Sequence, residues 1–177
     1  MPDYALTAIG RDRPGIVAAL SRALLDLDGN IEDSQMSILR GHFAVMLIVR
    51  FPGSASPEEL AARMDRAREE LGLEALTLAA VDELAAAGQG ASHVLSVYGA
   101  DHPGIVAAIS SVLAELEVNI TDLETRLTGA AEAPLYVMLM EVGLGDADPA
   151  DVERALAEAA AEADVELTLR ALDAEAL

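Results

Sequence analysis

The residues of this chain that could bind a small ligand belong to a short motif that occurs twice. The stretch GRDRPGIVAAL occupies residues 10–20, and GADHPGIVAAI occupies residues 99–109, 89 positions later. In each copy a predicted strand ends, the chain turns and a helix begins, so the first amides of that helix have no partner within it. Gly15 and Gly104 carry no side chain that would block approach to these amides. Such a helix start can bind a small carboxylate.

The same motif also has a purely structural interpretation. Asp12 and Asp101 could cap their own helices, and the glycines could simply allow a helix to pack closely on a sheet. Capped helix starts are far more common than ligand-binding ones, so the spacing alone favours the structural interpretation.

A second pair of residues recurs at equivalent places in the two copies. Asn30 and Asn119 stand where the predicted helix returns to the sheet, and each is followed by an isoleucine, Ile31 or Ile120. Their amides could contact a ligand. Asparagine is also common just after a helix end because it tolerates turn conformations, so this pair alone leaves both interpretations open.

Residues typical of enzymes do not form a recognisable arrangement in this sequence. The histidines, His42, His93 and His102, lie in unlike contexts without metal-ligand spacing. Candidate serine nucleophiles fall on predicted amphipathic helices and lack a sharp strand-to-helix turn. The absence of cysteine excludes disulfides, thiolate metal sites and cysteine nucleophiles. We therefore expect no enzyme activity, no metal and no cofactor.

The repeat predicts two small domains, each with the element order βαββαβ. In the first half we expect strands at 4–9, 30–39, 42–51 and 73–81, and helices at 14–27 and from 57, the second capped by Ser56. In the second half we expect strands at 93–99, from 119, at 134–143 and at 165–171, and helices at 103–117 and from about 149. This order predicts an α+β fold of two ferredoxin-like domains, with antiparallel sheets and helices on one face. We place the domains at 1–83 and 92–173, the linker at 84–91 and a tail at 174–177.

The third strand of each half is apolar on both faces. In HFAVMLIVRF the residues Ala44, Met46 and Ile48 alternate with a second apolar series, so both faces need cover. We therefore expect a homo-oligomer in which sheets stack.

The connection between the second and third strands differs between the two halves. It is Arg40-Gly41 in the first half, and we predict a longer loop around TGAAEAP in the second. With this loop, Val45 of the first half aligns with Val137 of the second.

Composition and charge limit the partners of the chain. Hydrophobic residues make up 53% of its 177 residues but aromatic residues only 3%, so the cores must be aliphatic. A formal net charge of −20 repels nucleic-acid phosphates, and no stretch is long and apolar enough to span a membrane. The first residues lack the features of a signal peptide. We expect a cytoplasmic protein that binds neither nucleic acid nor membrane directly.

These features together resemble a known family. The combination of Asp-Xaa-Pro-Gly-Ile-Val after one strand and Asn-Ile at the start of the next, in a βαββαβ unit, is similar to the ACT domain, a regulatory amino-acid-binding module. The resemblance covers nearly the whole chain, twice. The tandem arrangement and the run NIEDSQMSILRGHFAVMLIV resemble, within that family, the glycine cleavage system transcriptional repressors.

The resemblance implies where a ligand would bind. In paired ACT domains the effector lies between the loop after the first strand of one domain and the start of the second strand of the other. By position, this implies the following ligand-binding residues: Gly10, Asp12, Pro14, Gly15, Asn30 and Ile31, with Gly99, Asp101, Pro103, Gly104, Asn119 and Ile120. It also implies that the two halves pair through their first helices and second strands. The motif varies at one position, Arg13 in one copy and His102 in the other.

Two functions are consistent with this sequence. The first is a sensor that binds a small amino acid of the glycine or serine class and acts through a protein partner, a regulator or an enzyme, in control of glycine cleavage gene expression. The second is an interaction module that assembles with another protein and senses no ligand.

Overall fold

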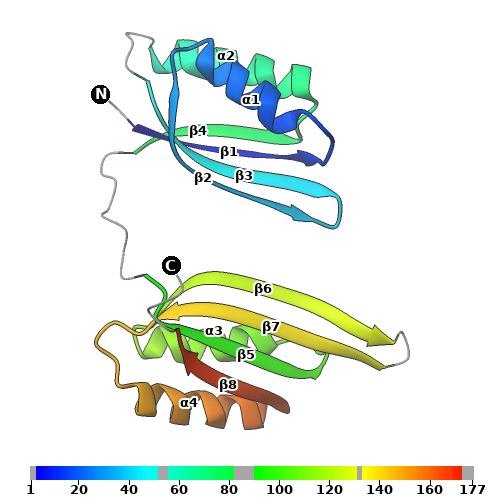
Figure 1. The fold of residues 1–177 in the computed structure, drawn as a ribbon, viewed down its shortest axis with the longest axis vertical. Coiled ribbons are helices and arrows are strands. Elements are labelled where there is room, and N and C mark those ends of the chain that lie inside the picture. Colours follow the sequence, from blue (N-terminus) through cyan, green and yellow to red (C-terminus); the bar gives the residue numbers. More distant parts are fainter. Residues whose placement is uncertain (1–2, 52–55, 82–89, 131–132, 173–177) are drawn as a thin grey trace. The chain divides into compact units, whose positions relative to one another are not determined.

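The structure, a computed structural model, describes residues 3–51, 56–81, 90–130 and 133–172. It divides into two compact units, residues 1–85 and 86–177, each of which is described by itself. Each unit has the predicted order βαββαβ (Figure 1). The predicted linker at 84–91 and tail at 174–177 fall mostly outside the described residues.

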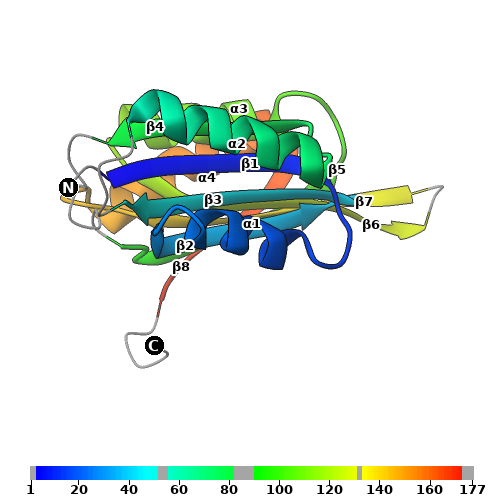
Figure 2. The same cartoon turned by 90° about the horizontal axis from the view of Figure 1, so that it is seen from above.

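The first unit is a four-stranded antiparallel sheet with two helices on one face. Its strand order is β2-β3-β1-β4. Figure 2 shows α1 and α2 side by side across the sheet, with α1 towards β2 and α2 towards β4. The elements are β1 (Asp3–Arg11), α1 (Ile16–Leu25), β2 (Asn30–Leu39), β3 (His42–Arg50), α2 (Pro57–Leu71) and β4 (Ala75–Val81).

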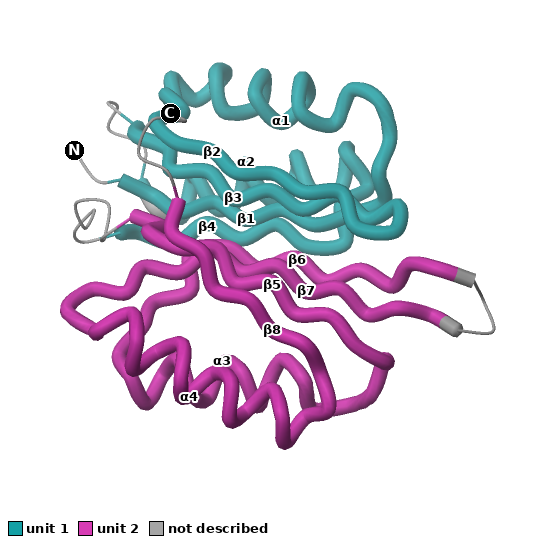
Figure 3. The backbone as a smooth tube through the Cα atoms, turned by 60° about the horizontal axis from the view of Figure 1, so that its bottom comes forward, with its two compact units in different colours: residues 1–85 teal, residues 86–177 magenta. Residues whose placement is uncertain are grey.

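The second unit repeats this arrangement with strand order β6-β7-β5-β8. In both units the helices lie on one side of the unit's own sheet, as Figure 3 shows. The predicted fold class is therefore confirmed. The elements are β5 (His93–Ala100), α3 (Ile105–Glu115), β6 (Asn119–Ala130), β7 (Ala133–Gly143), α4 (Pro149–Glu162) and β8 (Val165–Ala171).

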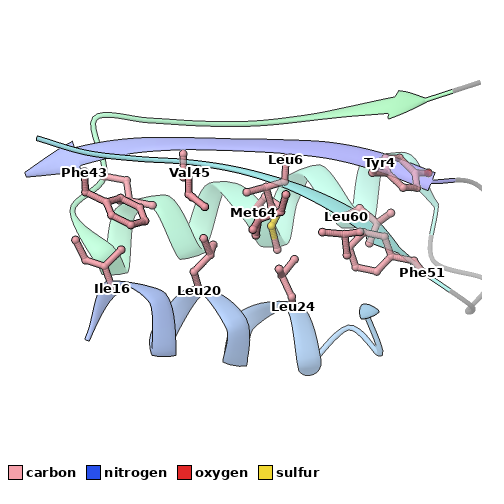
Figure 4. Packing of buried hydrophobic residues seen from close by; sticks show 14 residues of the cluster. Tyr4, Leu6, Ile16, Leu20, Leu24, Phe43, Val45, Phe51, Leu60 and Met64 are labelled. Atoms are coloured by element: carbon pink, nitrogen blue, oxygen red, sulfur yellow. The ribbon is translucent and has the colours of Figure 1, made fainter. Parts of the chain in front are cut away.

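Alternation along the central strands places one apolar series against the helices. In the first unit Leu6 of β1 is fully buried, and Leu20 and Leu24 of α1 pack on it and its neighbours, as Figure 4 shows. An edge-to-face contact between Tyr4 and Phe51, with ring centroids 5.5 Å apart, closes one end of this core. The second core is built from aliphatic residues in the same way. At roughly 1.5–3 kcal/mol for each buried large side chain, these cores hold the helices on the sheets.

The first helix of each unit begins later and ends earlier than predicted. Pro14 and Pro103 lie two residues before α1 and α3, because Gly15 and Gly104 first turn the chain at φ 92° and 106°. Both helices end two residues before the predicted 27 and 117, and a residue in the left-handed region follows each of them.

The second helix of each unit begins with a side-chain cap. At α2 the predicted cap Ser56 accepts from the Glu59 amide, and the Glu59 carboxylate accepts from the Ser56 amide. At α4 Asp148 accepts from the Ala150 amide. Each helix then begins with proline at its first position, which has no N–H that needs a partner.

The hairpin β6–β7 corrects the predicted loop around TGAAEAP. The added residues form strand pairs, Gly129 with Pro134 and Ala130 with Ala133, rather than a loop. The two copies therefore align 93 positions apart in β3 and β7, so Val45 corresponds to buried Met138 and not to Val137. Because side chains alternate along a strand, this difference of one residue places Val137 on the opposite face of its sheet.

The face of each sheet that is turned away from its own helices is apolar at its centre. In the first unit this open face includes Ile9 at 45% and Met46 at 54% exposure. In the second unit Tyr98, Leu135 and Leu139 occupy it at 38–42% exposure. The predicted apolar character of both faces of the third strand is confirmed.

Candidate functional site

The repeated motif forms the turn between the first strand and the first helix of each unit. Gly15 and Gly104 are the N-cap residues of α1 and α3, and neither helix start has a side-chain cap. The interpretation that Asp12 and Asp101 cap these helices is therefore wrong; both side chains are exposed. A Cβ at Gly15 or Gly104 would meet nothing within 4 Å. The first amides of both helices are thus approachable, as a carboxylate ligand would require.

The first glycine of each motif has a packing role. A Cβ at Gly10 would lie 3.0 Å from Leu73 Cδ2 and 3.3 Å from its Cα. At Gly99 it would lie 2.7 Å from Val165 Cγ1. These glycines let the end of the first strand lie against the segment that begins the last strand. Packing is sufficient to explain why both positions are glycine.

The residue at the variable position of the motif contacts the end of the second helix in both copies. The Arg13 guanidinium donates to the carbonyl of Leu71, the last residue of α2. The Nε2 atom of His102 lies 2.8 Å from the carbonyl of Ala163, the C-cap of α4. Leu71 and Ala163 are equivalent, since each lies two residues before the residue that packs on Gly10 or Gly99. Although the two residues differ in type, both connect the motif loop to the end of the second helix.

The asparagines occupy the first positions of the edge strands β2 and β6. Asn30 pairs in register with Arg50, and Asn119 pairs with Gly143; both asparagine side chains are exposed. A β-bulge follows in each copy, between Ile31 and Asp33 and between Ile120 and Asp122. Ile31 is 36% exposed, whereas Ile120 packs partly on its core.

The motif loop and the asparagine of one unit lie at opposite ends of its sheet. Gly10 pairs with Phe43 at one end of β3, whereas Asn30 pairs with Arg50 at the other. Seven residues separate these two partners, which at ~3.3 Å per residue is about 23 Å. The second unit has the same separation, between Tyr136 and Gly143. One unit therefore does not bring its own predicted site residues together.

The surroundings of the two asparagines differ in charge. Beside Asn30, Arg50 forms ion pairs with Asp3, at 2.9 Å, and with Glu32. The hydrogen bond that Arg50 donates to the Asp3 carboxylate, with the negative charges of Asp3 and Glu32, raises the pKa of Arg50. At the equivalent position beside Asn119 the residue is Gly143, so the first copy has a cation next to its asparagine and the second copy does not.

An apolar groove of about 150 Å³ runs between α1 and β2 of the first unit. Its floor is formed by core residues of β3, and Ser21 and Ser34 contribute hydroxyl groups to it. The apolar walls are Val17, Leu20, Ile31 and Met36. The groove opens along β2, the edge strand whose ten residues are all exposed.

Tyr136 is a polar residue near the second motif that sequence reasoning missed. It pairs with Gly99 and occupies the place of Phe43, adding a hydroxyl near the loop. Burial, together with the Asp101 carboxylate, raises the pKa of Tyr136. The correct alignment of the third strands, 93 positions apart, would have revealed this difference.

No group of His, Cys, Asp and Glu that could hold a metal ion occurs among the described residues. Within the same residues no helix is long and apolar enough to cross a membrane.

Comparison with known proteins decides the family. Residues 5–77 match the profile of the ACT domain, and residues 93–161 match a second ACT-domain profile. The chain belongs to the ACT-domain family. A UPF0237 protein of Methanopyrus kandleri is 42% identical to it over 77 residues, which are 43% of this chain and 86% of that protein.

Two solved structures resemble this tandem ACT-domain chain along almost its whole length. An unknown protein from Galdieria sulphuraria is 28% identical with a TM-score of 0.76, and the match covers 97% of this chain and 99% of that one. A protein named as a proposed glycine cleavage system transcriptional repressor is 17% identical with a TM-score of 0.71, covering 97% and 98%. At 17% identity the second likeness shows the fold alone.

Proposed function

We propose that this tandem ACT-domain protein senses a small amino acid of the glycine or serine class and passes the signal to a protein partner. The observation that carries the proposal is the separation of the motif loop from the asparagine within each ACT domain. Two domains placed side by side and antiparallel, second strand to second strand, would bring the loop of one beside the asparagine of the other. Pairing of the two halves of the chain in this way remains a prediction.

The chemistry of the two half-sites suits an amino acid. The amides at Gly15 and Gly104 would bind the carboxylate, since the start of a helix carries unpaired N–H groups and a partial positive charge. The side-chain oxygen of Asn30 or Asn119 would accept from the ammonium group. Glycine and serine have little or no apolar side chain, so the site needs no apolar pocket to hold them.

Control of glycine cleavage gene expression is the process we assign to this sensor. It is supported by the sequence resemblance to such repressors and by the name of one full-length structural relative. The net charge of −20 favours a protein partner with a basic surface over direct contact with DNA.

Calorimetric titration of glycine and L-serine into the full chain tests the ligand proposal. We expect Asn30→Ala and Asn119→Ala to weaken binding by roughly 10- to 150-fold, because a hydrogen bond to a charged group contributes about 1.5–3 kcal/mol. The melting temperature should change little, since both side chains are exposed. Arg66→Ala, at an exposed position of α2 away from both half-sites and from β2, is the control and should bind normally. Unchanged affinity with a lowered melting temperature in both asparagine variants would give these residues a structural role.

A second candidate function is an interaction module without a ligand. The fully exposed edge strand β2, with the apolar groove beside it, favours this alternative, because an extended segment of another protein could add to such an edge. If none of the common amino acids produces heat or raises the melting temperature, the interaction module replaces the sensor.

A further inference from the structure

Arg13 and His102 connect the motif loop to the end of the second helix in each ACT domain. Arg13 donates to the carbonyl of Leu71, and His102 reaches the equivalent carbonyl of Ala163 at 2.8 Å. Each connection spans about 60 residues of sequence and ends on one of the last carbonyls of a helix, which have no partner within that helix. It therefore fixes where the loop lies relative to α2 or α4.

A cation at this position is favourable, because the end of a helix carries a partial negative charge. Helix α2 already has Arg68 in its last turn, whereas the last turn of α4 contains no basic residue. Glu162 and Asp164 add negative charge there. When it is protonated, His102 therefore supplies a cation to the end of α4 from outside the helix.

The imidazole of His102 lies between two carbonyl oxygens. Its Nε2 atom faces Ala163 and its Nδ1 atom lies 3.1 Å from the carbonyl of Pro103. A carbonyl oxygen only accepts, so both contacts are hydrogen bonds when both ring nitrogens carry a proton. The neutral ring has one N–H, and its other nitrogen then faces an oxygen without a proton between them. Asp101 from the loop and Asp164 from the turn after α4 are the charged groups that act on the ring, and both favour its protonation.

We propose that Arg13 and His102 are the positioning residues of the two motif loops, and that the second loop is held more firmly when His102 is protonated than when it is neutral. A guanidinium group is always charged in proteins, so we expect the hold on the first loop to be independent of pH. The proposal concerns the loops themselves and does not depend on an amino acid binding to them.

The direction of the pH effect follows from the two bonds. Hydrogen bonds to the Pro103 and Ala163 carbonyls, with the charges of Asp164 and Asp101, raise the pKa of His102 above its usual value of about 6.5. A raised pKa in the folded state means that the contribution is complete below pH ~6.5 and is lost as the pH rises through the folded value. The second loop should therefore loosen on the alkaline side of neutrality.

Nuclear magnetic resonance of the full chain between pH 5.5 and 8.5 tests this inference. His42 lies beside the first loop, since the Asp12 amide donates to the neighbouring Gly41 carbonyl, so all titrations use the His42→Gln background. We expect the His102 ring to titrate with a midpoint above 6.5, and the amide of Gly104 to follow that midpoint. The amide of Gly15 should not follow it.

Exchange of the two residues separates positioning from a local charge effect. In His102→Arg the Gly104 amide should stop titrating and stay near the acid limit of the parent, whereas in His102→Ala, which removes both contacts, it should stop titrating at a position well away from that limit. Arg13→His should make the Gly15 amide titrate. A ring midpoint at or below 6.5, a Gly104 amide that does not respond, or identical loop signals in His102→Arg and His102→Ala would overturn the proposal.

Discussion

Two acidic residues occupy strained backbone positions in the turns that follow the first helices. Asp28 and Glu117, 89 positions apart, have φ values of 57° and 56°, in the left-handed region. Around them the Gly29 and Val118 amides donate to the Leu24 and Leu113 carbonyls, which closes each helix end. Aspartate tolerates this region better than glutamate, because its short side chain can bond locally.

We therefore expect Glu117→Gly to raise the free energy of unfolding by about 0.5–1 kcal/mol. Relief of the ~1–2 kcal/mol of strain is partly offset by the greater freedom of glycine in the unfolded chain. Asp28→Gly is the matched comparison and should gain less. Urea unfolding followed by circular dichroism measures both changes. A loss of stability in Glu117→Gly would show that its side chain makes a contribution larger than the strain.

At this scale the sequence shows which positions recur in the two copies, but it does not show the contacts that these residues make. The pattern identified Gly10, Asp12, Gly15 and Asn30 with their counterparts, and the structure places the loop residues in one turn of each domain. The crowding of Gly10 by Leu73 and the contact between Arg13 and Leu71 join residues about 60 positions apart. Such contacts depend on the tertiary arrangement and leave no local pattern.

Close packing between the first and last strands sets the cost of changing the motif glycines. A Cβ at Gly99 would lie 2.7 Å from Val165 Cγ1, closer than real contacts allow, and would force β5 and β8 to shift. We expect Gly99→Ala to cost about 1–3 kcal/mol of stability, as overpacking does. Gly10→Ala should cost less, because the atom nearest its Cβ is the end of the flexible Leu73 side chain, at 3.0 Å.

Thermal unfolding of these variants checks the packing argument. Gly90→Ala is the control, since a Cβ at Gly90 would meet nothing within 4 Å and should leave the melting temperature nearly unchanged. Val165→Ala removes the closest methyl group and should restore part of the stability lost in Gly99→Ala. A Gly99→Ala variant as stable as the parent would mean that the strands adjust without cost.

The type and order of the helices and strands were predicted more accurately than the residues at which they begin and end. The order βαββαβ followed from periodicity and turn residues, and the strands 30–39 and 165–171 have the predicted limits. The predicted helix starts are wrong because the Pro-Gly pair precedes the helix, and its glycine has a positive φ that a helix does not allow. The β6–β7 loop was wrong because Gly129 and Pro134, typical of turns, lie opposite each other in a ladder.

The open face of the first domain's sheet is uncharged at its centre. On the open face of the first domain, the central positions of β1, β3 and β4 carry no charge in a protein with a net charge of −20. These positions are Ala5, Thr7, Ile9, Ala44, Met46, Ile48, Ala75, Thr77 and Ala79. Between strongly acidic copies, association would be easiest through such a face.

We expect the protein to self-associate and Met46→Glu to weaken that association. Met46 is 54% exposed, so the change should barely affect stability, whereas a buried carboxylate at the contact would be costly. Ala62→Glu, at an exposed position of α2, adds the same charge away from the sheet and is the control. Light scattering at micromolar concentration gives the molar mass. A parent protein that is monomeric under these conditions would contradict the expectation.

Direct DNA binding is not expected from the same charge distribution. The densest basic group is Arg63, Arg66 and Arg68 on α2, and Arg68 pairs with Asp65 and Glu69 at 4.0 and 3.8 Å. Neutralising phosphates requires clustered cations that are not already surrounded by carboxylates. A mobility-shift assay with the pure protein at low salt should show no complex, and tight binding would overturn the partner-mediated output.

The longer hairpin of the second domain shows how this architecture can accept additional residues. Strands β6 and β7 are each two residues longer than β2 and β3, so the four added residues enter as two complete cross-strand pairs. When both strands are lengthened by two residues, every side chain that faces the core still faces it. A single residue added to one strand would instead turn all later side chains of that strand to the opposite face. The tip of a hairpin is therefore a natural place for length variation between duplicated copies. It is also where an engineer could lengthen the β2–β3 ribbon, two residues per strand, to carry a spectroscopic label without disturbing the core.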